Sequence, residues 1–107
     1  MWFNKYMNVS STIKKYFVYI VKCSDNTYYT GKTVDISKRV LQHNGELPNG
    51  AKYTRTRRPV ELVHFEEYLT NALAFKRERE IKKMKRADKN YLIYHHNIQI
   101  IERIQGK

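Results

Sequence analysis

The clearest pattern in the chain is a nearly continuous apolar run over residues 16–23, followed by a short polar stretch and a second run over residues 27–31. The first run is rich in β-branched and aromatic residues, which favours a strand that is buried on both faces. The polar stretch SDN, residues 24–26, is typical of a turn. The two runs are therefore predicted to form a β-hairpin.

The length of that turn decides which side chains of the hairpin share a face. A two-residue loop would put Tyr19 and Tyr29 on opposite faces, whereas a three-residue loop pairs Tyr19 with Gly31 and brings the two tyrosines onto one face. Asn26 can adopt the left-handed conformation that a three-residue loop favours at its last position. We therefore expect the three-residue loop, in which Gly31 leaves the Tyr19 ring uncovered.

A helix is predicted directly after the hairpin. Thr33 or Asp35 can cap its N-terminus, and the helix should reach about residue 44 because Gly45 follows. Arg39 and His43 are four residues apart, so they share a face of this helix and point in the same direction.

The remaining elements follow from changes in periodicity. Residues 44–59 are expected to form a loop, and residues 60–68 read as a third strand. Thr70 can cap a helix over residues 71–86, and Asp88 can cap a final helix. The predicted order is thus strand, strand, helix, strand, helix, helix.

One carboxylate occupies an unusual position on the helix after Thr70. Glu78 lies four residues after Ala74 and three before Ile81, at the edge of the apolar stripe. A carboxylate there needs a cation, a hydrogen bond or a metal ion as its partner. Spacing alone favours an ion pair with Lys82, and Glu80 is the second candidate carboxylate.

Composition adds the expectation of a phosphate-rich partner. The 107 residues suit one domain, and 21 Lys and Arg against 10 Asp and Glu give a formal net charge of +11. Such a charge favours nucleic acid, although a merely soluble basic surface is the alternative. The single cysteine, Cys23, excludes an internal disulfide and fits a reducing, cytoplasmic location. No run is long enough to span a membrane, and no secretory signal is apparent.

Basic residues gather in two segments, the loop 44–59 and the helix 71–86. In the loop they interleave with an aromatic ring that can stack on a base or a sugar, although a solvated basic loop explains the same composition. The side chains expected to contact nucleic acid are Lys32, Lys52, Tyr53, Arg55, Arg57, Arg58, Lys82 and Lys85.

Seven residues stand at the spacing of a known set of motifs, namely Tyr19, Tyr29, Thr30, Gly31, Arg39, His43 and Glu78. Together they resemble the GIY-YIG nuclease domain, and the resemblance covers roughly residues 16–92. The stretch GAKYTR, residues 50–55, is similar to the short stand-alone members of that family. The first motif, which ends at Tyr19, lacks the glycine and the isoleucine of the family. The second motif, Tyr29-Thr30-Gly31, has threonine in place of isoleucine. Both departures are common in the short members. Asn90 is a candidate for the polar residue that the family often uses near the domain end.

The resemblance implies an α+β fold, with a small three-stranded antiparallel sheet flanked by helices, and metal-dependent phosphodiester cleavage. Tyr19 would help to deprotonate the attacking water, and Tyr29 would orient the water or the phosphate. Arg39 would neutralise the scissile phosphate, and His43 would assist in proton handling. Glu78 would hold one divalent cation, Mg²⁺ or Mn²⁺, because a single carboxylate suits an ion that keeps most of its waters.

The leading hypothesis is a monomeric, divalent-metal-dependent DNA endonuclease in repair or processing, without an organic cofactor. The rival is a non-catalytic, basic nucleic-acid-binding module with the same fold, which the lack of an appended DNA-recognition domain favours. A basic structural protein on ribosomal RNA would explain the charge but not the site residues.

The chain is expected to consist of one domain between two short terminal segments. Residues 1–15 are expected to be a frayed leader, residues 16–95 the nuclease domain, and residues 96–107 a helical extension or tail. Catalysis predicts that the five site side chains border one open cleft. A position of Glu78 on the opposite side of the sheet from Tyr19 would overturn the enzyme hypothesis.

Overall fold

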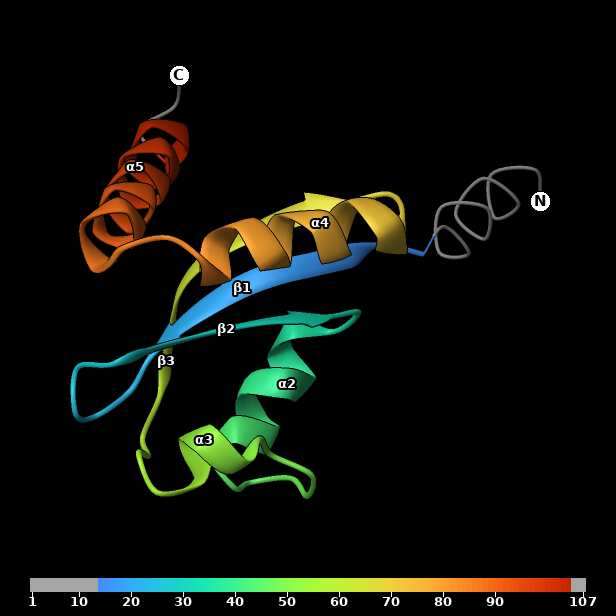
Figure 1. The fold of residues 1–107 in the computed structure, drawn as a ribbon, viewed down its shortest axis with the longest axis vertical. Helices are drawn as coiled ribbons and strands as arrows, with labels where there is room; N and C mark the ends of the chain where they lie inside the picture. The colour runs from blue at the N-terminus through green and yellow to red at the C-terminus, as the bar shows by residue number, and fades with distance from the viewer. Residues whose placement is uncertain (1–13, 105–107) are drawn as a thin grey trace.

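The computed structural model describes residues 14–104, with side chains placed up to residue 96. At its centre is a three-stranded antiparallel sheet with the strand order β2-β1-β3 (Figure 1). Its strands are β1 (Tyr16–Lys22), β2 (Tyr28–Thr33) and β3 (Glu61–Tyr68). The predicted α+β class and the predicted sheet are both confirmed.

The hairpin between β1 and β2 has the three-residue loop that the sequence predicts. Asn26 has a φ of 69°, the left-handed conformation expected at the last loop position. The register pairs Tyr19 with Gly31 and Val21 with Tyr29. Because side chains alternate along a strand, Tyr19 and Tyr29 lie on the same face of the sheet.

Helix α2 (Ile36–His43) follows β2 and carries two of the predicted site residues. Of the two possible caps, Asp35 is the N-cap, and its carboxylate accepts a hydrogen bond from the Lys38 amide at 3.0 Å. Gly45, with a φ of 80°, follows the helix end.

The segment 44–59 is not entirely a loop, as the sequence pattern had suggested. It contains the short helix α3 (Lys52–Arg55). Four residues are too few to show a helical period, so the pattern of apolar residues could not reveal this turn.

The two C-terminal helices have other boundaries than predicted. Helix α4 (Asn71–Lys82) is capped by Thr70 as expected, but it ends about four residues earlier than predicted. At its end the Lys83 amide donates to the carbonyls of Arg79 and Glu80. Helix α5 (Arg86–Ile104) begins before Asp88, which lies in its first turn rather than at its cap. No glycine or proline marks the break. α5 runs through residues 95 and 96 without interruption, and the expected leader lies mostly outside the described residues.

The sheet separates two apolar clusters. Helix α4 covers one face, where Val18 and Ile20 pack against Ala74 and Ile81. Tyr19 belongs to the opposite face, and α2 and α3 both lie on that side of the sheet (Figure 1). None of the helices in the described part of the chain is long and apolar enough to cross a membrane.

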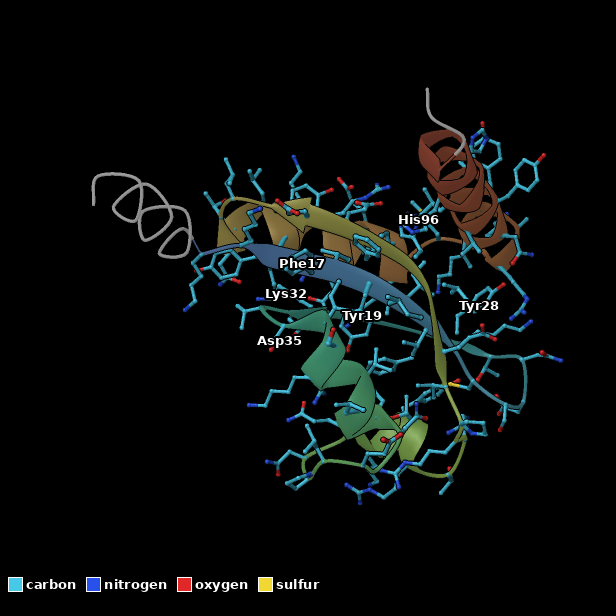
Figure 2. All side chains as sticks on the ribbon, turned by 180° about the vertical axis from the view of Figure 1, so that it is seen from behind. Phe17, Tyr19, Tyr28, Lys32, Asp35 and His96 are labelled. Atoms are coloured by element: carbon cyan, nitrogen blue, oxygen red, sulfur yellow. The ribbon has the colours of Figure 1, made fainter. Side chains whose placement is uncertain are left out.

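Helix α5 lies beside β3, the second edge strand of the sheet. The His96 ring is centred 5.0 Å from His64 and 4.9 Å from Phe65 (Figure 2). Covering an edge strand with a helix prevents it from pairing with another chain.

Candidate active site

Tyr19 is the centre of the candidate site. Its side chain lies between the sheet and α2 and is only 1% exposed (Figure 2). A Cβ atom added at Gly31 would lie 2.6 Å from Cζ of Tyr19, which is shorter than real contacts allow. Glycine at this position therefore makes room for the ring, but the ring is buried and not uncovered as expected.

His43 contacts Tyr19 directly. The Tyr19 hydroxyl and Nε2 of His43 are 2.7 Å apart, and Nδ1 of His43 lies 2.8 Å from the hydroxyl of Thr54. Burial lowers the pKa of His43 to about 4, and the positive charges of Arg39 and Arg58 contribute to the shift. The imidazole is therefore neutral at neutral pH.

Tyr19 is held in its protonated form. Burial raises the pKa of its hydroxyl to about 12, and the neighbouring positive charge of Arg39 only partly offsets this effect. The charges of Tyr29 and Glu78 raise the pKa further. Tyr19 can therefore accept a proton from water only if additional positive charge arrives or its own proton leaves at the same time.

Tyr29 belongs to a stack of rings that leads from the site to the hairpin turn. Its ring is centred 5.1 Å from His43, edge-on, and 5.8 Å from Tyr53, at an interplanar angle of 24°. The guanidinium of Arg57 lies 3.9 Å from the centre of the Tyr53 ring and forms an ion pair with Asp25 at 3.1 Å. Tyr53 and Arg57, which we expected to contact nucleic acid, thus already have partners within the protein.

The two arginines whose charges act on His43 are also anchored. Arg39 donates to the side chain of Gln42 at 2.8 Å and to the carbonyl of Asn49 at 2.9 Å. Arg58 donates to the carbonyl of His43 at 2.7 Å. Arg58 therefore holds the end of α2, in addition to any contact with phosphate.

Glu78 approaches the site from the other face of the sheet. Its helix, α4, packs on the face opposite Tyr19, which counts against the expectation that the five site side chains border one open cleft. Its negative charge nevertheless acts on Tyr19 and raises its pKa. The charge of Glu78 is therefore the one link between it and Tyr19 that the described residues show.

The ion pair that spacing alone favoured is present. Glu78 and Lys82 are 3.1 Å apart, and the Glu78 side chain is 14% exposed. Two further candidates lie on this side of the sheet, where Lys32 donates to Asn71 at 2.6 Å and Asn90 accepts from Tyr28 at 2.6 Å. Lys82 and Lys32 thus have partners within the protein.

A divalent cation at this site would have Glu78 as its carboxylate ligand. The described residues include no group of three or more His, Cys, Asp or Glu side chains that could enclose a metal. Mg²⁺ tolerates such a site because it keeps several waters and binds through one or two carboxylates together with substrate phosphate. Glu78 would hold a hydrated Mg²⁺ or Mn²⁺ in place of its ion pair with Lys82, and the residues do not fit a closed structural metal site.

The remaining predicted nucleic-acid contacts are exposed. Lys52 and Arg55 on α3 and Lys85 before α5 make no ion pair or side-chain hydrogen bond within residues 14–96. Thr54, which binds His43 from the same short helix, was not singled out in the sequence. The only available signal was its place in the GAKYTR stretch.

Comparison with known proteins defines the class to which this site belongs. The family model of the GIY-YIG catalytic domain matches residues 15–92, most of the chain. The chain therefore belongs to the GIY-YIG family, a family of nucleases.

Within that family the chain is similar to short, single-domain proteins. It is 53% identical over 81 residues to a UPF0213 protein of Syntrophus aciditrophicus (strain SB), covering 76% of this chain and 92% of the relative. It is 54% identical over 78 residues to UPF0213 protein HQ_3675A of Haloquadratum walsbyi (strain DSM 16790 / HBSQ001), covering 72% and 84%. The solution NMR structure of the protein EF2693 from E. faecalis superimposes with a TM-score of 0.53 at 34% identity, covering 78% of this chain and 88% of that chain.

Proposed function

We propose that this protein is a divalent-metal-dependent endonuclease that hydrolyses phosphodiester bonds in DNA, in repair or processing. The observation that carries the proposal is the buried hydrogen bond between Tyr19 and His43, 2.7 Å long, on which the charges of Arg39 and Glu78 both act. Family membership supports the reaction class, and the net charge of +11 supports a nucleic-acid substrate.

The arrangement provides a route for the proton of the attacking water. The water gives its proton to the oxygen of Tyr19 while the hydroxyl proton of Tyr19 moves to Nε2 of His43, so that the net acceptor is His43. Arg39 compensates the negative charge that develops on the phosphate. A divalent cation, when bound, supplies further positive charge for the phosphate and for the water. Tyr29 orients the phosphate or the water next to His43.

Three observations favour the rival function. Helix α4, which carries Glu78, packs on the face opposite Tyr19. Glu78 is already paired with Lys82, and a Tyr19 with a pKa of about 12 stays protonated in the resting protein. A protein in which these conditions persist in the presence of substrate would bind nucleic acid through its basic surface without cleaving it.

Cleavage of labelled DNA distinguishes the two functions. Single-stranded, duplex and branched substrates are incubated with Mg²⁺, with Mn²⁺ and with a chelator, using the wild type, Tyr19→Phe and Glu78→Gln. We expect metal-dependent cleavage that falls by at least about 100-fold in both variants, because each removes a group that acts in the transition state.

Matched controls come from the same elements. Tyr16→Phe changes a tyrosine three residues earlier on β1, and Glu80→Gln changes the carboxylate that pairs with Arg77 at 3.1 Å. Both should cleave as the wild type does. If all five proteins bind DNA in a salt-sensitive way and none of them cleaves it, the protein is a binding module.

A further inference from the structure

Thr54 lies at the end of a buried chain of hydrogen bonds. Its side chain is 0% exposed, and its hydroxyl donates to the carbonyl of Ala51 at 3.1 Å. The same oxygen lies 2.8 Å from Nδ1 of His43, whose Nε2 lies 2.7 Å from the hydroxyl of Tyr19. Thr54, His43 and Tyr19 thus form one connected series.

The number of protons in this series determines which group donates and which accepts in each hydrogen bond. A hydroxyl has one proton to donate, and a carbonyl can only accept, so Thr54 uses its proton on Ala51. The Thr54 oxygen must then accept a proton from Nδ1 of His43. A neutral imidazole carries one N–H, so Nε2 has none and accepts from Tyr19.

The opposite direction satisfies fewer groups. If Thr54 donated to Nδ1 instead, its bond to Ala51 would be lost. Nε2 of His43 would then donate to Tyr19, whose own proton, in a side chain that is 1% exposed, would have no acceptor among the described residues. A buried donor without a partner is costly, so the first direction is the stable one.

We infer that Thr54 is a positioning residue, whose hydroxyl fixes His43 as the Nδ1–H tautomer and thereby keeps Nε2 ready to receive the proton of Tyr19. The catalytic meaning of this inference rests on the proposed nuclease function. In the reaction, water loses a proton to Tyr19, Tyr19 loses its proton to Nε2, and the resulting imidazolium still donates from Nδ1 to Thr54. With the other tautomer, Nε2 already carries a proton and cannot receive a second one.

Nitrogen NMR of histidine tests the tautomer without reference to activity. In the ¹⁵N-labelled full-length wild type, His43 should show a protonated Nδ1 and an unprotonated Nε2 near neutral pH. Thr54→Val keeps the shape of the side chain but removes the hydroxyl, so the Nε2–H tautomer should become populated. Thr54→Ser keeps the hydroxyl and should restore the wild-type pattern.

Thr30→Val is the matched control. Thr30 is also buried, at 5% exposure, but its side chain lies on the other face of the sheet, and its hydroxyl has no partner among the described residues. This variant should leave the His43 tautomer unchanged.

Kinetics completes the test. For DNA cleavage we expect kcat to fall roughly 10- to 100-fold in Thr54→Val, with KM nearly unchanged, and to recover in Thr54→Ser.

Three results would each overturn the inference: a wild-type His43 protonated at Nε2, a tautomer unaffected by Thr54→Val, or an altered tautomer with unchanged kcat. If Thr54→Val does not fold, the wild-type and Thr54→Ser spectra still decide the tautomer. If the wild type does not cleave DNA, the nuclease proposal fails, while the NMR result still stands or falls by itself.

Discussion

At the scale of single residues, the absence of a side chain at Gly31 matters as much as the groups that react. Tyr19 is the largest fully buried side chain among the described residues, and its ring occupies the place where a β-carbon at position 31 would stand. Tyr19 can therefore lie across β2 and still reach His43. The packing of one strand position thus determines the geometry of the candidate catalytic pair.

Gly31→Ala tests this dependence. The added carbon would have to displace the buried Tyr19 ring, so the free energy of unfolding should fall by about 1–3 kcal/mol, as in other overpacked cores. Urea denaturation measures the change, and DNA cleavage should decrease with it. Thr30→Val, at the preceding position, should have the opposite sign, with a gain of about 1 kcal/mol, because it removes a buried hydroxyl without a partner. A stable Gly31→Ala protein with full activity would contradict the proposed role of Gly31.

At the scale of elements, Glu66 connects β3 to α4. Its carboxylate accepts from Arg77 on α4 at 2.8 Å and from Tyr68 at 2.6 Å and His64 at 2.7 Å on its own strand. Burial by itself would raise the pKa of Glu66, but the hydrogen bonds from His64, Arg77 and Tyr68 outweigh burial and lower it to about 2. Glu66 thus helps to hold α4, and with it Glu78, against the sheet.

The lowered pKa predicts an acid-sensitive contribution to stability. The unfolded chain binds a proton at Glu66 near its ordinary pKa of 4.5, well before the folded protein does. The stabilisation by Glu66 is therefore complete above about pH 4.5 and is lost as the pH falls through 2, with a total of about 3 kcal/mol. Denaturation of the wild type and of Glu66→Gln should show a difference in stability that shrinks over this range.

Glu67→Gln is the control for this experiment. Glu67 is the next residue on β3, but its partner is the exposed Lys15 at 3.1 Å, and an exposed ion pair contributes little. The free energy of unfolding of Glu67→Gln should equal that of the wild type at every pH. If the free energy of unfolding of Glu66→Gln also equals that of the wild type at every pH, Glu66 does not hold α4 in place.

At the scale of the whole molecule, the net charge of +11 is distributed between structural and free cations. Arg57 and Arg58 anchor the segment around α3, and Lys82 is paired with Glu78. Lys52 and Arg55 project from α3 without a partner among the described residues, close in sequence to Thr54. The short helix α3, whose Thr54 contacts His43, thus also presents cations at the surface.

These cations should account for part of the salt dependence of nucleic-acid binding. Replacing Lys52 and Arg55 together by alanine should reduce the slope of log K against log salt concentration by roughly 1.4–1.8, since each phosphate contact contributes about 0.7–0.9. Fluorescence anisotropy with labelled DNA measures the slope. Lys14 and Lys15, replaced together, remove the same charge near the start of β1 and should change the slope less. Equal effects would mean that net charge, and not this surface, governs binding.

The sequence by itself determined the features that depend on spacing within one element or across one tight turn. The three-residue hairpin loop, the shared face of Tyr19 and Tyr29 and the ion pair between Glu78 and Lys82 are of this kind. For the cap of α2 the sequence offered Thr33 or Asp35, and the structure selects Asp35. Side-chain direction repeats with a fixed period in strands and helices, so these relations can be read without knowing how the elements pack.

The tertiary structure decided the relations between segments that are distant along the chain. It placed α4 on the face opposite Tyr19, ended α4 at Lys82 without a glycine or proline, and brought Thr54 to His43 from a four-residue helix. No local period encodes these contacts, because they arise from which apolar surfaces cover each other and which buried polar groups find partners. The sequence therefore identified the chemical groups of the candidate site, and packing alone determined how His43 and Glu78 are presented to Tyr19.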